Sequence, residues 1–169
     1  MTASKEPDLP QDPVLDAEIA AFIQSGVSII AASRDAANMP AVARALGCRV
    51  SPDRRRVTIL VAGSQGVELL EDVGATGAIA VVFTLPSTHR AIQLKGRDAR
   101  AESLAAGDLE IMAALAGTFA ADLAPFGYTT AFVRALLACE PDDAVAIAFT
   151  PTAAFSQTPG ARAGAPLHA

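Results

Sequence analysis

Residues 86–96, PSTHRAIQLKG, place four polar side chains in a turn ahead of a strand that alternates apolar and polar residues. The four are Ser87, Thr88, His89 and Arg90, and each can donate a hydrogen bond to a phosphate group. Loops that precede strands are ordinarily polar, so a solvated turn explains the same composition. The segment therefore indicates either an anion-binding turn or a plain surface turn.

A second place for anion chemistry lies where a predicted strand, residues 57–63, runs into a predicted short helix, residues 64–73. Ser64 and Gln65 stand at this junction. The free N–H groups and the dipole of a helix start attract phosphate. A serine that only caps the helix is the alternative.

Arg44 is a charged residue in a predicted strand, residues 41–50, made mostly of small apolar side chains. A guanidinium in such surroundings needs a counter-charge, because burying an unpaired charge is costly. A carboxylate or a phosphate would provide it. Arg44 is therefore a third candidate anion ligand.

Several enzyme classes lack the residues that they require. Only two histidines are present, His89 and His168, and neither has a partner at metal-ligand spacing, so we expect no metal site. The chain has no GxxxxGK[ST], GxGxxG or GxSxG motif. The neighbouring acids at 71–72 and 142–143 point to different sides of their elements, which predicts solvated surface.

The composition bounds the class of protein. A chain of 169 residues suits one domain, and a net charge of −5 with only two lysines argues against a nucleic-acid partner. No uninterrupted apolar stretch reaches the roughly 18 residues of a membrane span. The acidic, proline-rich start resembles no secretory signal, so we expect a cytoplasmic protein. Cys48 and Cys139 fit no metal or redox spacing.

The pattern of the chain predicts a mixed fold rich in strands. We expect a flexible arm over residues 1–11, one domain over residues 12–155 and an irregular tail over residues 156–169. The first helix should be capped by Asp12 and end at Gly26. Further helices are predicted at 64–73, closed by Gly74, and at 108–125 and 130–139. Strands are predicted at 27–33, 41–50, 57–63, 78–85, 91–95 and 144–151. Because most strands follow one another in pairs, an antiparallel barrel with attached helices is favoured over a βαβ sheet.

Three segments resemble the flavin-binding split-barrel superfamily that includes pyridoxamine 5'-phosphate oxidase. They are PAVARALGCRV, VTILVAGSQGVELLEDV and AIAVVFTLPSTHRAIQLKGR, and the likeness extends over residues 12–159. The resemblance implies an α+β fold of the FMN-binding type: a six-stranded antiparallel split β-barrel with flanking helices. It also implies a homodimer with FMN in a cleft between the two subunits.

The resemblance further implies roles for individual residues. Arg44 matches an arginine that approaches the flavin phosphate or ring edge, and Ser64 matches a hydroxyl at the phosphate junction. Arg90 and Gln93 fall on a strand that contacts the ring. The expected cofactor-binding residues are Arg44, Ala62, Gly63, Ser64, Gln65, His89, Arg90 and Gln93.

Two departures from the oxidases shape the functional expectation. The oxidases carry an arginine and a lysine after the junction serine, where this chain has Gln65 and Gly66, and their substrate-phosphate residues have no counterpart here. We therefore expect an FMN-dependent oxidoreductase with a substrate other than pyridoxamine phosphate. The alternatives are a non-catalytic flavin- or haem-binding protein, with His89 as the axial ligand of a haem, and a dimeric barrel without a cofactor.

Overall fold

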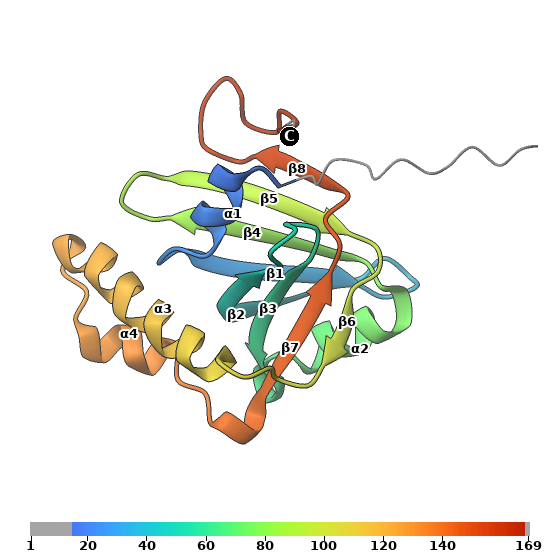
Figure 1. The fold of residues 1–169 in the computed structure, drawn as a ribbon, viewed down its shortest axis with the longest axis horizontal. Coiled ribbons are helices and arrows are strands. Elements are labelled where there is room, and N and C mark those ends of the chain that lie inside the picture. The colour runs from blue at the N-terminus through green and yellow to red at the C-terminus, as the bar shows by residue number, and fades with distance from the viewer. Residues whose placement is uncertain (1–14, 168–169) are drawn as a thin grey trace, which may run out of the picture.

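The computed structural model describes residues 15–167, which form one antiparallel sheet with attached helices (Figure 1). The helices are α1 (Ala17–Ile23), α2 (Val67–Thr76), α3 (Asp108–Leu123) and α4 (Thr130–Leu136). The strands are β1 (Ser28–Arg34), β2 (Pro40–Val50), β3 (Val57–Ala62), β4 (Ile79–Leu85), β5 (Arg90–Gly96), β6 (Arg100–Glu102), β7 (Ala144–Phe149) and β8 (Ala153–Ser156). Their order in the sheet is β6-β7-β3-β2-β1-β4-β5-β8.

The described chain has eight strands, whereas the resemblance predicts six. The two additional strands are β6, with three residues, and β8, with four. Such short segments carry too few alternating positions for periodicity to reveal them. Both lie at the ends of the sheet, where each pairs with one neighbour only.

The sheet curls so that its two halves meet. The amide of Thr152, between β7 and β8, donates to the carbonyl of Lys95 at 2.8 Å. Gly96, at the end of β5, packs so closely on β7 that an added Cβ would lie 2.7 Å from the ring of Phe149. The bend predicted at Gly96 therefore serves this close approach, which only a residue without a side chain allows.

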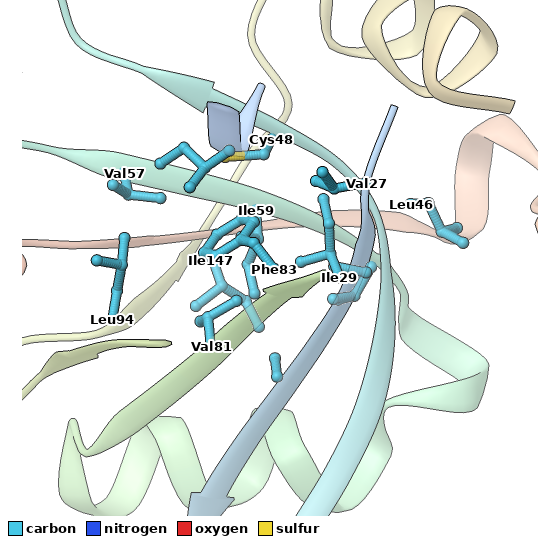
Figure 2. Close-up of a cluster of buried hydrophobic side chains, with 14 of the residues drawn as sticks. Val27, Ile29, Leu46, Cys48, Val57, Ile59, Val81, Phe83, Leu94 and Ile147 are labelled. Carbon is cyan, nitrogen blue, oxygen red and sulfur yellow. The ribbon is translucent and has the colours of Figure 1, made fainter. Parts of the chain in front are cut away.

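Alternate residues of the strands point inward and form the core. Figure 2 shows Ile29, Ile59, Phe83 and Ile147, from four different strands, packed around one centre, and all four are buried. Burying each such side chain contributes about 1.5–3 kcal/mol. Because these side chains are held in the core, the residues next to them along each strand face the opposite side of the sheet.

The first helix begins later than predicted. Helix α1 starts at Ala17, and its N-cap is Asp16, whose carboxylate accepts a hydrogen bond from the amide of Ile19 at 2.7 Å. The predicted cap, Asp12, and the predicted arm lie outside the described residues. Both aspartates precede the apolar run, and the periodic pattern alone did not distinguish them.

Both ends predicted for the second helix were wrong. Ser64 lies in a single 3₁₀ turn, Gly63–Gln65, and does not cap α2, which begins at Val67. At the other end Gly74 is inside the helix, and Gly77 ends it with a φ of +65°. A Cβ at Gly77 would lie 2.6 Å from the carbonyl oxygen of Arg97, so position 77 needs glycine for two reasons.

Helix α3 packs against β2, and α4 packs against α3. Gly47 of β2 lies close to Leu60, Ile111 and Met112, which leaves no room for a larger residue there. The buried carboxylate of Asp108 accepts a hydrogen bond from Nε of Arg49 at 2.8 Å, which ties the start of α3 to β2. This contact fixes α3 at the place predicted for its first residue.

One stretch of the described chain, Asp108–Phe126, is long and apolar enough to cross a membrane by length and composition, and 17% of it is buried in the fold. The sequence analysis searched only for uninterrupted apolar runs. It did not find this stretch, because acidic residues interrupt its apolar residues. Leu115, Phe119 and Leu123 recur at helical spacing and join the core. They pack α3 onto the protein, as the sequence predicts.

Candidate functional site

The uniformly apolar sequence of β4 predicts a strand buried on both sides, but in the structure its residues alternate. Ile79, Val81 and Phe83 are buried, while Ala80 and Val82 are only half-buried. The same alternation in the neighbouring strands leaves a continuous surface, which we call the outer sheet face. It consists of Ser28, Ile30, Ala32, Val42, Arg44, Ala80, Val82, Thr84, Gln93 and Phe155.

Two of the predicted site residues lie in one row on the outer sheet face. Arg44 pairs with Ile30, Ile30 pairs with Val82, and Val82 pairs with Gln93. Paired residues of neighbouring strands point to the same side, and strands lie about 4.8 Å apart, so Arg44 and Gln93 are separated by about 14 Å of sheet. An apolar floor of Ile30 and Val82 thus has a cation at one end and an amide at the other.

The polar side chains at the two ends of the row, Arg44 and Gln93, can still form hydrogen bonds with a ligand. Nη1 of Arg44 donates to Oγ of Ser28 at 3.1 Å, and within residues 15–167 no carboxylate forms an ion pair with Arg44. The predicted counter-charge is thus not an acid of the described chain. Oε1 of Gln93 accepts a long hydrogen bond from Nε2 of Gln157 at 3.4 Å.

The strand-to-helix junction holds four of the predicted site residues, and a carboxylate already occupies it. The amide of Ser64 donates to Oδ1 of Asp143 at 2.8 Å, and its hydroxyl donates to Oδ2 at 2.6 Å. Gly63 lies against the same residue, with the site of an added Cβ 3.1 Å from the carbonyl oxygen of Asp143. Ala62, the last residue of β3, is buried beneath them.

A phosphate group does not fit this junction. The cavity beside it measures about 240 Å³ and is lined by Gln65 and Glu68 but by no arginine or lysine. A phosphate placed there would meet the carboxylates of Glu68 and Asp143 and would compete for both donors of Ser64. At the junction implied by the resemblance, Asp143 therefore already takes both donors of Ser64.

The last two predicted site residues lie at the tip between β4 and β5. His89 is exposed and adopts a φ of +58°, as turn residues do. Arg90 donates from Nη2 to Glu18 at 2.7 Å, and its guanidinium lies 4.4 Å from the ring centroid of Phe22. Arg90 thus connects the start of β5 to α1.

The two cysteines are unsuited to nucleophilic chemistry. Burial raises the pKa of Cys48 far above its ordinary value, against a smaller opposite effect of Arg49. Burial, with Asp143 and Glu140 nearby, also raises the pKa of Cys139. Both thiols are free and stay protonated at neutral pH. Among the described residues, no three acids, histidines or cysteines gather as a metal site would require.

Sequence reasoning missed three residues of these sites. Ile30 and Val82 form the floor between Arg44 and Gln93, and the mostly apolar runs that contain them do not alternate in polarity, so no local signal marks them as outward-facing. Asp143 was predicted to be solvated surface. Nothing in its local sequence indicates a contact with Ser64, which lies 79 positions away.

No protein-family model matches the sequence, and no curated protein matches it. Solved structures do match. HupZ from Group A Streptococcus is 15% identical with a TM-score of 0.53, over 89% of this chain and 99% of that chain. General stress protein 26 from Bacillus anthracis is 14% identical with a TM-score of 0.50, over 90% and 96%.

A candidate pyridoxamine 5'-phosphate oxidase from Lactobacillus delbrueckii is 15% identical with a TM-score of 0.50, over 87% of this chain and 97% of that chain. The fold is a split β-barrel. The predicted α+β class and the resemblance to oxidase-related split barrels are thus confirmed for the fold. At such low identity, what this split barrel binds has to be argued from its own residues.

Proposed function

We propose that this split barrel is a flavin-binding oxidoreductase that works as a homodimer, with the flavin ring lying on the outer sheet face. The observation that carries the proposal is the row from Arg44 to Gln93. It offers a half-buried cation without an ion-pair partner in the described chain, an apolar floor and an amide. A planar ring system with polar edges matches these three features.

Each residue of the row has a distinct part in this proposal. Ile30 and Val82 contact the flat side of the ring and exclude water from it. Arg44 faces its electron-rich edge or an anionic substituent, and Gln93 forms hydrogen bonds with ring heteroatoms. A bound flavin supplies the redox chemistry itself, so the protein needs only to hold and orient the ring. This explains why the outer sheet face has no acid–base pair.

The homodimer follows from the shape of the face. A planar ligand on the outward face of a sheet has protein on one side only, so a second wall is needed to bury it. Ile30, Val82 and Phe155 leave apolar surface half-exposed on this face. A second copy related by a two-fold axis would present the same surface and close the site.

The closed junction makes a sharp prediction about the ligand. Because Asp143 holds the donors of Ser64, the phosphate of FMN gains no contact there. We expect riboflavin and FMN to bind with dissociation constants within about threefold of each other, a difference of under 1 kcal/mol. Titration of the purified protein, followed by quenching of flavin fluorescence, measures both constants. Failure of both flavins to bind would overturn the proposal.

Two substitutions test the location of the ring. Arg44→Ala should weaken riboflavin binding about tenfold, the loss of one charge-assisted hydrogen bond. Arg134→Ala removes an exposed arginine on α4, far from the row in the sheet, and should change nothing. Ile30→Glu should separate the dimer in analytical ultracentrifugation and abolish flavin binding at the same time. Equal effects of the two arginine substitutions would place the ring elsewhere.

The oxidoreductase activity needs its own experiment. Photoreduced flavoprotein is mixed with oxygen, ferricyanide or a quinone, and reoxidation is followed by absorbance. We expect at least one acceptor to react with bound flavin at a rate clearly different from that of free flavin. If bound flavin and free flavin are reoxidised at identical rates by every acceptor, the protein binds flavin without catalysing its reaction.

One observation favours a second candidate, a dimeric split barrel without a cofactor. Asp143 supplies internally the anion that a flavin phosphate would otherwise provide to Ser64, so the junction is complete without a ligand. A stable dimer in ultracentrifugation that takes up neither riboflavin nor FMN would favour this candidate over the first.

A further inference from the structure

A cavity of about 620 Å³ lies at one edge of the outer sheet face, away from the strand-to-helix junction. It is formed where β1 and β5 end and where β4 and β8 begin, next to the last turn of α2. Three cationic residues line it, Arg34, Lys95 and Arg97, and we call this cavity the basic pocket. The sequence analysis assigned no function to any of the three.

The charge of the basic pocket is opposite to that of the chain. Its lining includes three cations and no carboxylate, although the protein has a net charge of −5. Within residues 15–167, no ion pair involves Arg34, Lys95 or Arg97. Four other arginines each pair with a carboxylate, namely Arg49, Arg56, Arg90 and Arg100. The positive charge of the basic pocket is therefore left uncompensated by the described chain.

The backbone holds the two arginines on the same side of the basic pocket. The hydroxyl of Thr76 donates to the carbonyl of Arg34 at 3.2 Å. Gly77 follows directly and packs against the carbonyl of Arg97, and its own carbonyl accepts from the amide of Ala99 at 2.9 Å. The end of α2 thus braces both segments, and two arginines separated by 63 positions line one hollow.

The sequence also explains why there is a hollow. Where β1, β4 and β8 line the pocket, they carry alanine at outward positions: Ala32, Ala80 and Ala153. Larger side chains there would fill the space between the cations. The ammonium group of Lys95 lies 5.1 Å from the ring centroid of Phe155, which pairs with Gln93 on the outer sheet face.

From this arrangement we infer that the basic pocket binds a phosphate group, either as the free ion or as the end of a larger small molecule. Planar guanidinium groups match phosphate oxygens in two-point contacts, and an ammonium group adds charge from a third direction. The small alanine side chains at the bottom of the pocket leave room for the phosphate group. No carboxylate of the described chain lines the pocket, so none lies there to repel the phosphate. The pocket shares Ala32 and Ala80 with the outer sheet face and begins one residue pair beyond the row, but the inference does not rest on flavin binding, because the cations of the pocket carry it.

A structural role for the cations is the competing explanation. Positive side chains near the C-terminal end of a helix are stabilising, and α2 ends beside the basic pocket. The two roles differ in what they predict. A binding role makes the cations matter for phosphate affinity, whereas a structural role makes them matter for stability and leaves no saturable phosphate site.

The test is a titration of the full-length, isotope-labelled protein with inorganic phosphate at low ionic strength, followed residue by residue in amide NMR spectra. We expect saturable shifts at 32–34, 76–78 and 95–97. Arg97→Ala should weaken binding about tenfold and Arg34→Ala about as much, since each removes a charge-assisted contact. Arg134→Ala, the matched control, should leave the affinity unchanged.

Phenyl phosphate distinguishes the two sources of the phosphate group. Tighter binding of phenyl phosphate than of inorganic phosphate, with additional shifts at Ala80, indicates the end of a larger molecule, and equal affinities indicate the free ion. Equal losses in Arg97→Ala and Arg134→Ala, shifts confined to 64–68, or no saturable shift at all would overturn the inference. A fall in melting temperature without any phosphate binding would assign the cations to the end of α2.

Discussion

The basic pocket and the strand-to-helix junction are the two places in this split barrel where an anion would be sought, and they differ in how their charge is balanced. At the junction, the donors of Ser64 are satisfied by Asp143, from a turn that follows α4. In the basic pocket, Arg34 and Arg97 have no carboxylate partner in the described chain. The first place is internally neutralised, and the second is open to an external anion.

The comparison shows that hydrogen-bond donors alone do not define an anion site. Ser64 has the right donors at the position that the resemblance implies, but a contact from a distant segment has used them. Positive charge without an ion-pair partner is a better indicator of an anion-binding site. A cation that already pairs with a carboxylate of the protein has the counter-charge that an anionic ligand would provide.

The largest expected effect comes from making the basic pocket resemble the junction. Lys95→Glu places a carboxylate among the cations and should weaken phosphate binding about 100-fold, through one lost attraction and one new repulsion. Isothermal titration calorimetry measures the loss. Lys95→Met, which keeps a chain of similar length over Phe155, should lose only about tenfold. Equal losses in the two variants would show that charge is not the cause.

A smaller effect is expected from the reverse change, opening the junction. Asp143→Ala frees the amide and the hydroxyl of Ser64, so the affinity for FMN relative to riboflavin should rise about tenfold. The variant should also lose about 1–3 kcal/mol of unfolding free energy, because two hydrogen bonds to a charged group disappear. Flavin fluorescence titration and urea unfolding provide the two measurements.

The control for the junction is the neighbouring acid. Asp142→Ala removes the same charge from a neighbouring exposed side chain, whereas the contact with Ser64 is made by Asp143, and it should leave both the FMN preference and the stability unchanged. If Asp142→Ala and Asp143→Ala raise the FMN preference equally, general electrostatics rather than freed donors governs the junction.

The smallest expected effect is that of salt. Raising the ionic strength from about 0.05 M to about 0.5 M should weaken phosphate binding to the basic pocket about threefold to tenfold, because its cations are exposed. The stability difference between the natural chain and Asp143→Ala should hardly change, since the Ser64 contact is a short, direct hydrogen bond. Calorimetry and urea unfolding at both salt concentrations compare the two sites. Salt-independent phosphate binding would contradict an electrostatic basic pocket.

Most strands and the longest helix could be predicted because their signals are local. The short β-rich run in 27–33, the alternating residues in 91–95 and the helical spacing after Asp108 reflect which side chains the core must bury. The ends of α2 were missed for non-local reasons. The hydroxyl of Ser64 binds a residue 79 positions away, and Gly77 rather than Gly74 faces the carbonyl of Arg97.

The candidate site was predictable only in part. Arg44 stood out because a charge in an apolar strand requires an explanation, and its place at one end of the row supports its selection. Its floor was missed because β1 lies between β2 and β4 in the sheet, an order that local patterns do not reveal. The junction was misjudged because the composition of a segment does not show which donors another segment satisfies.

By itself the sequence determined the class of fold, the core positions and the excess of acidic over basic residues, since these follow from composition and from periodicity along the chain. Only the tertiary structure decided which charges meet. It brought Asp143 onto Ser64, and among residues 15–167 it gave Arg34, Lys95 and Arg97 no ion-pair partner. Electrostatic pairing depends on distances of a few ångströms between segments far apart in sequence, and folding alone sets those distances.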